Sequence, residues 1–373
     1  MIASINCSLS NEMIYSLLSD GASLWIATDG GLVKLNRQTE ETTVYTKENS
    51  GLPGNDVRSF AKDSDGKLWI TTYSGGLCVF DGTSWQVYDS INSGLHNRCY
   101  AIAIDNNNDK WISSGNCLMK FDITGCQSWT TPRSSLMKDS WVIHDMKFDK
   151  NGELWLAGFG TTMINTEGAT LIWTFAKFSG DAIQTYTNIT GSVSSITIDG
   201  ENNKWFGDAS GGGLYKYTGT GDTFANYSTT FYNGDISSKV QYVTKDIAGN
   251  LWLACNGYIV KFDGKKSLVN YGSVPDIDAV RCMEIDAEGV IWIGTSSSGL
   301  YRYSSGVFRK MSIGESGSGI ASVAAKDDPV VSVQYCDLLG KPVTERQKGS
   351  IYVVKELRQS GKITARKIVC KIP

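Results

Sequence analysis

An aspartate followed five or six residues later by a tryptophan recurs seven times along this chain of 373 residues. The tryptophans, spaced 40 to 50 residues apart, are Trp25, Trp69, Trp111, Trp155, Trp205, Trp252 and Trp292. Their aspartates are Asp20, Asp63, Asp105, Asp149, Asp199, Asp246 and Asp286. A period of this length indicates a repeat architecture, in which each unit buries its apolar faces against its neighbours.

Each repeat has the pattern of four short strands. In the second repeat, alternating apolar and polar residues predict strands at 57–62, 68–72, 77–80 and 85–88. Asp63 and Gly66 predict a tight turn after the first strand, because a carboxylate accepts backbone N–H groups and glycine adopts a positive φ. The Gly75-Gly76 pair predicts the turn from the second strand to the third.

Seven such sheets predict an all-β fold, a seven-bladed β-propeller, because radial stacking lets each sheet cover both faces. The seven tryptophans are expected to wedge between blades, since a residue that occupies the same place in every repeat is better explained by packing than by carbohydrate stacking. Residues 4–15 match the connector at 90–101, and the last blade supplies its own outer strand at 307–312. We therefore expect the ring to close by face packing, without a shared strand.

The remaining chain is expected to add a small C-terminal β-rich domain. The predicted organisation is a propeller at 1–312, a linker of small residues at 313–328 and the C-terminal domain at 329–373. The nine cysteines are odd in number and show no CxxC spacing, so neither a zinc site nor a disulfide framework is expected. Most are expected to be free and buried, with Cys336 and Cys370 as the exception to check.

Charge and hydropathy exclude several classes of partner. A formal net charge of -3 leaves no basic field for phosphates, so no nucleic acid is expected as a partner. No window approaches 18 consecutive apolar residues, so no membrane span is expected, and the first 20 residues lack the pattern of a signal peptide. Met1 precedes a segment typical of the middle of a repeat, so we expect that a leader was removed or the chain trimmed.

The pattern D-x-x-G-x-[LIV]-W-[IL]-x-[TA], followed by G-G-L and by connectors such as GLPGNDV, resembles the two-component regulator propeller repeat over roughly residues 11–312. Blades four (GFGTTMINTEG) and six (CNGYIVKFDG) depart from it by lacking the double glycine. In that family the propellers commonly form the periplasmic sensing part of hybrid histidine kinases of Bacteroidetes. The resemblance implies an extracytoplasmic role, although no transmembrane helix or kinase segment follows in this sequence.

The tail carries Y-x-D-L-x-G-K-x-V, then G-S-I-Y-V-V and R-K-I-V. These segments look like the C-terminal sorting domain of the type IX secretion pathway. That resemblance implies export, with the protein in the periplasm, at the cell surface or secreted. The alternative is a small β-sandwich fragment that docks against the propeller.

A ligand site is expected at the mouth of the central channel, where the inner strands of all blades converge. The residues just after the inner-strand starts are Tyr15, Arg58, Tyr100, His144, Ser194, Gln241 and Arg281. Because they differ from blade to blade, they are candidates for ligand contact, and the predicted ligand-binding set is Tyr15, Arg58, Tyr100, His144, Gln241 and Arg281. Arg58 and Arg281 are expected to clamp a carboxylate or sulfate, and Tyr15 to stack on a sugar ring. The alternative is that these side chains only solvate the channel rim.

Three functions follow from this arrangement. The leading prediction is a non-catalytic, monomeric, extracytoplasmic module that binds a glycan or peptide, with no cofactor and no metal. The second is a sensor or protein-interaction scaffold related to hybrid two-component systems. The third is a lyase or hydrolase in which Asp145 orients His144 as a general base. The repeat also resembles streptogramin-inactivating propeller lyases, which use histidine with acidic residues and a metal, but His96 lies in a loop and no second inner-strand histidine is present.

Overall fold

The computed structural model describes residues 13–115, 117–122, 125–129, 143–165, 168–180, 182–186, 191–217, 219, 223–227, 239–255, 257–265, 268–274, 279–311, 313, 330–336, 351–358 and 363–369. The chain divides into two compact units, Met1–Ser316 and Gly317–Pro373, each of which has its own strands. In the second unit, β29 (Val330–Cys336), β30 (Ile351–Arg358) and β31 (Ile363–Val369) form an antiparallel three-stranded sheet. None of the described residues belongs to a helix capable of crossing a lipid bilayer.

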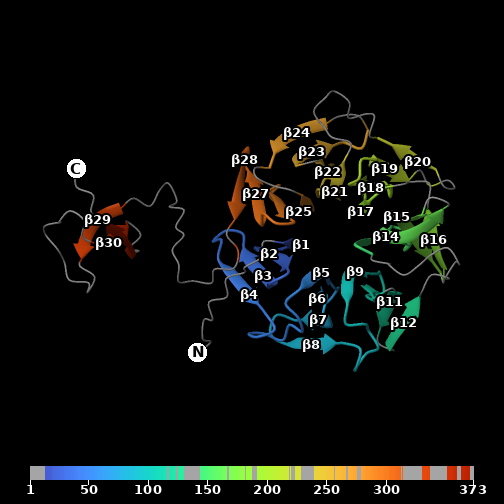
Figure 1. Cartoon of the computed structure of the whole chain (residues 1–373), viewed down its shortest axis with the longest axis horizontal. Helices are drawn as coiled ribbons and strands as arrows, with labels where there is room; N and C mark the ends of the chain where they lie inside the picture. The colour runs from blue at the N-terminus through green and yellow to red at the C-terminus, as the bar shows by residue number, and fades with distance from the viewer. Residues whose placement is uncertain are drawn as a thin grey trace. The chain divides into compact units, whose positions relative to one another are not determined.

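Seven four-stranded antiparallel sheets form the ring of the first unit, with the first strand of each nearest the channel (Figure 1). Blades one to four contain β1 (Ile14–Asp20), β2 (Ser23–Thr28), β3 (Gly31–Asn36), β4 (Thr42–Tyr45); β5 (Val57–Lys62), β6 (Leu68–Thr72), β7 (Gly76–Phe80), β8 (Trp85–Tyr88); β9 (Cys99–Ile104), β10 (Lys110–Ser114), β11 (Cys117–Asp122), β12 (Gly125–Trp129); and β13 (Asp145–Phe148), β14 (Leu154–Asn165), β15 (Gly168–Ser179), β16 (Ala182–Tyr186). Blades five to seven contain β17 (Val193–Ile198), β18 (Lys204–Asp208), β19 (Gly213–Tyr217), β20 (Phe224–Asn226); β21 (Val240–Lys245), β22 (Leu251–Cys255), β23 (Tyr258–Phe262), β24 (Leu268–Ser273); and β25 (Val280–Ile285), β26 (Ile291–Thr295), β27 (Leu300–Ser304), β28 (Val307–Met311). The all-β, seven-bladed prediction is confirmed, and in the second blade only the third strand differs, since it begins at Gly76.

The repeat aspartate holds the repeat tryptophan in every blade. Each indole Nε1–H donates to a carboxylate Oδ2, at 3.4, 2.7, 3.0, 3.4, 2.8, 3.0 and 2.9 Å from blade one to blade seven. In blade two the other oxygen, Asp63 Oδ1, accepts the N–H groups of Asp65 and Lys67 at 3.0 and 2.8 Å, which closes the turn around Gly66 at φ 82°. The aspartate side chain therefore both closes the hairpin turn and orients the tryptophan that packs between blades.

A cation covers each of these indoles. In six blades it comes from the residue opposite the tryptophan on the third strand, with the cation 5.0 to 5.9 Å from the ring centroid; these residues are Lys34, Lys120, Lys177, Lys216, Lys261 and Arg302. In blade two Val79 lies opposite Trp69, and Lys110 of blade three supplies the cation, 4.6 Å from the ring. Cation–π attraction thus stabilises the wedges from within a blade or from the next one.

The tryptophans pack between blades, as predicted. All seven are at most 6% exposed. Trp25 of blade one, for example, lies in one apolar cluster with Val57 and Phe60 of blade two. Burial of an aromatic side chain of this size contributes about 2 to 3 kcal/mol. Four cysteines, Cys78, Cys99, Cys255 and Cys282, are also free and buried, whereas Cys370 lies outside the described residues.

The ring closes through packed faces. Within the described residues, the sheets of blades one and seven share no strand. Trp292 and Cys282 of blade seven instead join one buried cluster with Ile14 and Leu24 of blade one. The predicted mode of closure is therefore confirmed.

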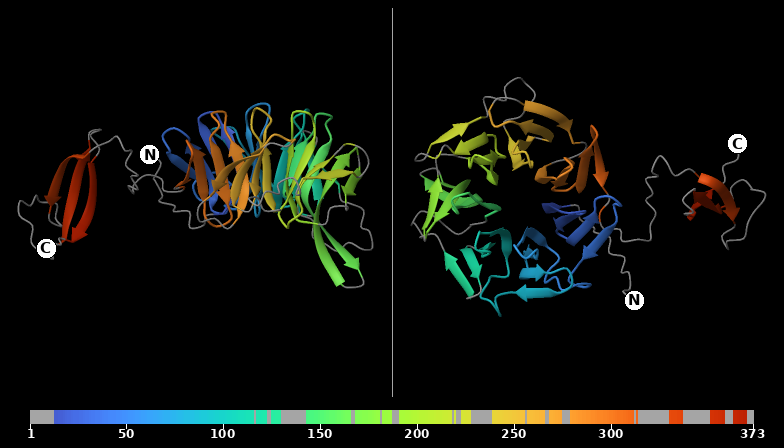
Figure 2. Two further views of the ribbon diagram at one scale, coloured as in Figure 1. Left: turned by 90° about the horizontal axis from the view of Figure 1, so that it is seen from above. Right: turned by 180° about the vertical axis from the view of Figure 1, so that it is seen from behind.

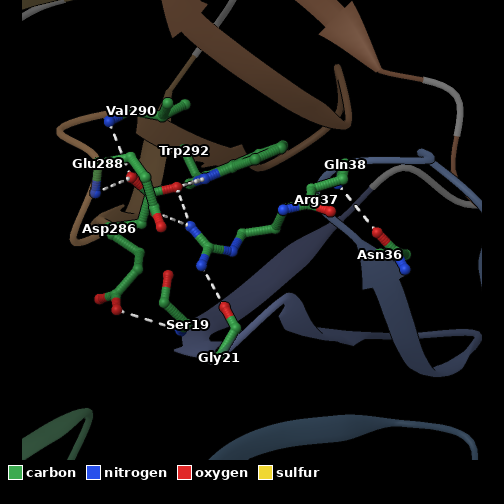
Figure 3. A network of polar contacts seen from close by, with 10 residues as sticks. Ser19, Gly21, Asn36, Arg37, Gln38, Asp286, Glu288, Val290 and Trp292 are labelled. Carbon is green, nitrogen blue, oxygen red and sulfur yellow. Dashed lines mark hydrogen bonds and ion pairs between the residues drawn. The ribbon is translucent and has the colours of Figure 1, made fainter.

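Polar contacts reinforce this seam between blades seven and one (Figure 3). Arg37 Nη1 lies 2.5 Å from Asp286 Oδ2, the oxygen that also accepts the Trp292 indole N–H. Arg37 also pairs with Glu288 and donates to the carbonyl of Gly21. The guanidinium thereby ties the strand and turn of one blade to the wedge carboxylate of the other.

Blade four departs most from the repeat. Its β14 and β15 have 12 residues each, and their pairing continues from Phe159–Thr174 to Asn165–Gly168. The resulting hairpin projects beyond the ring (Figure 2, green). Since connections from second to third strands lie on the face where inner strands begin, this hairpin stands on the same face as the predicted site.

The seam gives a stability prediction. Replacing Arg37 by alanine should lower the free energy of unfolding by about 2 kcal/mol, because it leaves the buried Asp286 carboxylate without its cation. Urea unfolding followed by tryptophan fluorescence measures the change. Lys47→Ala is the control: its pair with Glu48, at 3.8 Å, is exposed and should contribute less than about 0.5 kcal/mol. Equal unfolding midpoints for the two variants would contradict this role of Arg37.

Candidate functional site

The predicted positions meet in one cavity of about 500 Å³ inside the channel. Its lining includes all seven of them: Tyr15, Arg58, Tyr100, His144, Ser194, Gln241 and Arg281. The structure therefore brings the predicted set together, while ligand binding by these residues stays a prediction.

A β-bulge directs most of these side chains toward the cavity. In blade one Ile14 pairs with Thr28 and Ser16 with Ala27, so that Tyr15 is the extra residue. The same register shift occurs at Arg58, Ser194, Gln241 and Arg281. Because a bulge places two successive residues opposite one, it re-aims the extra side chain. A repeated irregularity thus presents one variable residue to the cavity from each of these five blades.

Arg58 and Arg281 both lie near the ring of Tyr15. Their guanidinium carbons are 4.0 and 5.0 Å from its centroid. Arg58 is already paired with Asp56: Nε lies 2.8 Å from Oδ1, and Nη2 donates to Oδ2 at 2.9 Å. Arg281 is exposed and forms no ion pair with the described residues. The two arginines of the predicted clamp therefore differ. Arg58 is held by Asp56, whereas Arg281 is exposed and accessible to a ligand.

Two further residues extend this cluster. Tyr73, in the turn after β6, has the guanidinium carbons of Arg58 and Arg98 at 4.7 and 5.5 Å from its ring centroid. Its ring also meets that of Tyr100 edge-on at 5.7 Å. The sequence reasoning missed Tyr73 and Arg98 because it considered only inner-strand starts. The signal was present, since Tyr73 lies just before the predicted Gly75-Gly76 turn and Arg98 lies in the connector at 90–101.

His144 is exposed to the channel, where the surrounding protein partly desolvates its ring. That desolvation, with the positive charges of Arg281 and Arg58, lowers the pKa of its imidazole to about 4. The ring packs on Gly158, where an added Cβ would lie 2.5 Å from His144 Cδ2 and where φ is +78°. A neutral imidazole is thus held against a glycine that no other residue replaces without strain.

Asp145 was expected to orient His144, but its carboxylate mainly accepts backbone N–H groups. Asp145 Oδ1 accepts the N–H of Met146 at 2.9 Å, and Oδ2 accepts that of Ile196, in the next blade, at 3.1 Å. Lys147 Nζ lies 3.3 Å from Oδ1. Asp145 therefore links two blades, and an imidazole with a pKa near 4 is a weak general base.

An unsatisfied acceptor lies in the same cavity. Gln241 Oε1 is buried and has no hydrogen-bond partner among the described residues. Buried amide oxygens nearly always accept a hydrogen bond from protein, water or ligand. No group of three His, Cys, Asp or Glu side chains that could hold a metal ion occurs in the described part of the chain.

Comparisons with known proteins agree with the repeat. Residues 51–74 match the family described as two component regulator propeller. A comparison with curated protein sequences gives no match.

Several solved structures share the fold. The extracellular domain of the putative hybrid two component system BT3049 from B. thetaiotaomicron is 18% identical, with a TM-score of 0.61, over 100% of this chain and 55% of that one. PorZ, a surface component of the type-IX secretion system of Porphyromonas gingivalis, is 14% identical, with a TM-score of 0.53, over 100% and 61%. Virginiamycin B lyase from Staphylococcus aureus is 15% identical, with a TM-score of 0.58, over 79% and 96%. At these identities the likeness shows the propeller fold alone.

The environment of His144 gives a pH prediction. Since its pKa lies below the ordinary 6.5, the unfolded chain takes up the proton first, and stability should fall as the pH drops from about 6.5 to about 4. The His144→Gln variant, which cannot titrate, should lose less stability over that interval. Arg281→Gln should raise the pKa of His144, because it removes a positive charge. NMR titration of the imidazole and urea unfolding measure both effects, and a pKa of 6.5 would contradict the assignment.

Proposed function

We propose that the channel mouth binds an acidic ligand outside the cytoplasm without transforming it. The observation that carries this proposal is the exposed guanidinium of Arg281, which forms no ion pair with any residue that the structure describes and which lies beside a cavity of about 500 Å³. Such a cavity, lined by a few convergent polar groups, is the usual form of a small-ligand site. Arginine binds carboxylates and sulfates through paired hydrogen bonds, so an anionic group is the expected partner of Arg281.

The neighbouring side chains restrict the chemical class of the ligand further. Gln241 Oε1 requires an N–H or O–H donor, which a peptide amide or a sugar hydroxyl supplies. Tyr100 and the neutral ring of His144 add surface for an uncharged part of the ligand. An acidic peptide or an acidic glycan has both features, whereas a neutral sugar lacks the anion.

Binding is favoured over catalysis by the state of His144. Its pKa of about 4 and the use of Asp145 in joining two blades weigh against this pair as a general base. The likeness to extracellular domains of two-component systems supports an extracytoplasmic place for the site and a role in sensing, in which the bound ligand is the signal.

A thermal-shift panel tests the proposal. Galacturonate oligomers and peptides with a free carboxylate should raise the melting temperature of the wild-type protein, whereas neutral galactose oligomers and amidated peptides should not. A ligand at about 100 times its Kd adds about 2.7 kcal/mol, equivalent to several degrees. Arg281→Gln should abolish the shift.

The matched control is Lys62→Gln, which removes a cation that pairs with Asp20 and does not line the cavity. This variant should keep the full shift. Stabilisation of wild type and Arg281→Gln by the same amount would refute the proposed site, as would equal effects of acidic and neutral probes.

A further inference from the structure

Strand β25 carries two opposite charges on one side. Arg281 lies over Tyr15 of blade one, and Glu284 Oε1 accepts the N–H of Ser19, also in blade one, at 3.1 Å. Cys282 packs in the same seam cluster, while Met283 packs with blade six. The bulge explains this order, because it turns two successive residues, Arg281 and Cys282, toward blade one before the alternation resumes.

The two charges are separated along the channel. Both residues line the cavity. By the register with β26, Glu284 lies two to three residues further along the strand than the bulged Arg281, which at about 3.3 Å per residue places its backbone about 7 to 10 Å deeper. The cavity therefore has a cationic mouth and an acidic interior.

Glu284 has no cation of its own. No lysine or arginine among the described residues forms an ion pair with it. Burial raises the pKa of its carboxyl, the Ser19 contact and Lys147 lower it, and Asp286 raises it. Lys147 is already matched, since its Nζ lies 3.3 Å from Asp145. Lys147, Asp145 and Glu284 together give the interior one more carboxyl group than it has cations.

We propose that the channel takes a short extended peptide with its amino group at Glu284 and a carboxylate at Arg281. This inference rests on the proposed function and names the class of ligand. An extended chain also rises about 3.3 Å per residue, so a tripeptide with free termini spans about 10 Å. An amide N–H between the two ends can donate to Gln241 Oε1, which lacks a partner among the described residues.

Other ligand classes satisfy only part of this arrangement. A uronate oligomer supplies an anion and hydroxyl donors but no ammonium group for Glu284. A polyamine supplies cations but no partner for Arg281. A metal ion is disfavoured, because the described residues provide no cluster of three ligating side chains. The zwitterionic peptide alone meets both charges and the orphan amide oxygen.

Isothermal titration of the full chain with trialanine tests the inference through four forms of the probe. These are the free peptide, the N-acetylated peptide, the C-amidated peptide and the doubly capped peptide. The free peptide should bind tightest, and each single cap should weaken binding at least tenfold. Glu284→Gln should remove the difference between free and acetylated peptide, because it removes the charge and keeps an acceptor for Ser19 N–H. Arg281→Gln should remove the difference between free and amidated peptide.

Glu201→Gln, an exposed carboxylate in a hairpin turn, is the control and should leave all four affinities unchanged. Urea midpoints check that the variants remain folded. Equal affinity of free and acetylated trialanine for the wild type would overturn the inference and leave the acidic mouth site standing. Failure of every carboxylate-bearing probe, galacturonate oligomers included, would instead overturn the proposed function.

Discussion

The hydrogen bond from each tryptophan indole to the repeat aspartate is the contact on which the ring depends. A buried indole N–H without an acceptor costs about 1 to 3 kcal/mol, so seven wedges require seven acceptors. The aspartate also closes the hairpin turn, which fixes where the wedge begins. At four junctions the same carboxylate meets a cation from the next blade, in the pairs Asp20–Lys62, Asp63–Lys110, Asp149–Lys204 and Asp286–Arg37. The repeat aspartate thus contacts the hairpin turn, the tryptophan and, at these junctions, the neighbouring blade.

Because this frame is constant, the residues at the inner-strand bulges are free to differ. Each bulge presents one side chain to the channel without disturbing the pairs that follow it. Tyrosine, arginine, serine and glutamine therefore occupy equivalent bulge positions in different blades, and together with His144 they create an asymmetric cavity. The cavity is asymmetric in its side-chain chemistry, because the backbone that carries these residues repeats from blade to blade.

The sequence was sufficient for features determined locally in each repeat: seven sheets, the strand bounds of the second blade except the start of its third strand, and the burial of the tryptophans. Alignment of the repeats with one another also identified the cavity residues, because it compares equivalent positions of the seven blades. The sequence did not reveal the Trp–Asp bond, although both residues were singled out, since spacing does not give side-chain geometry. The cations over the indoles depend on cross-strand register, and at Trp69 the cation comes from another blade. The pairing of Arg58 with Asp56, two residues away, likewise depends on how the connector folds.

The seam between blades seven and one differs from the other six junctions, because it joins the first and last blades in the chain. Its strength must come from side chains, and those same side chains approach the ligand site. Arg281 meets Tyr15 and Glu284 meets Ser19 across this seam, and Tyr15, Arg281 and Glu284 also line the cavity. A ligand held by both charges of β25 therefore binds where the ring closes. Any such ligand stabilises the closed ring by an amount set by its affinity, which couples occupancy of the channel to the integrity of the fold.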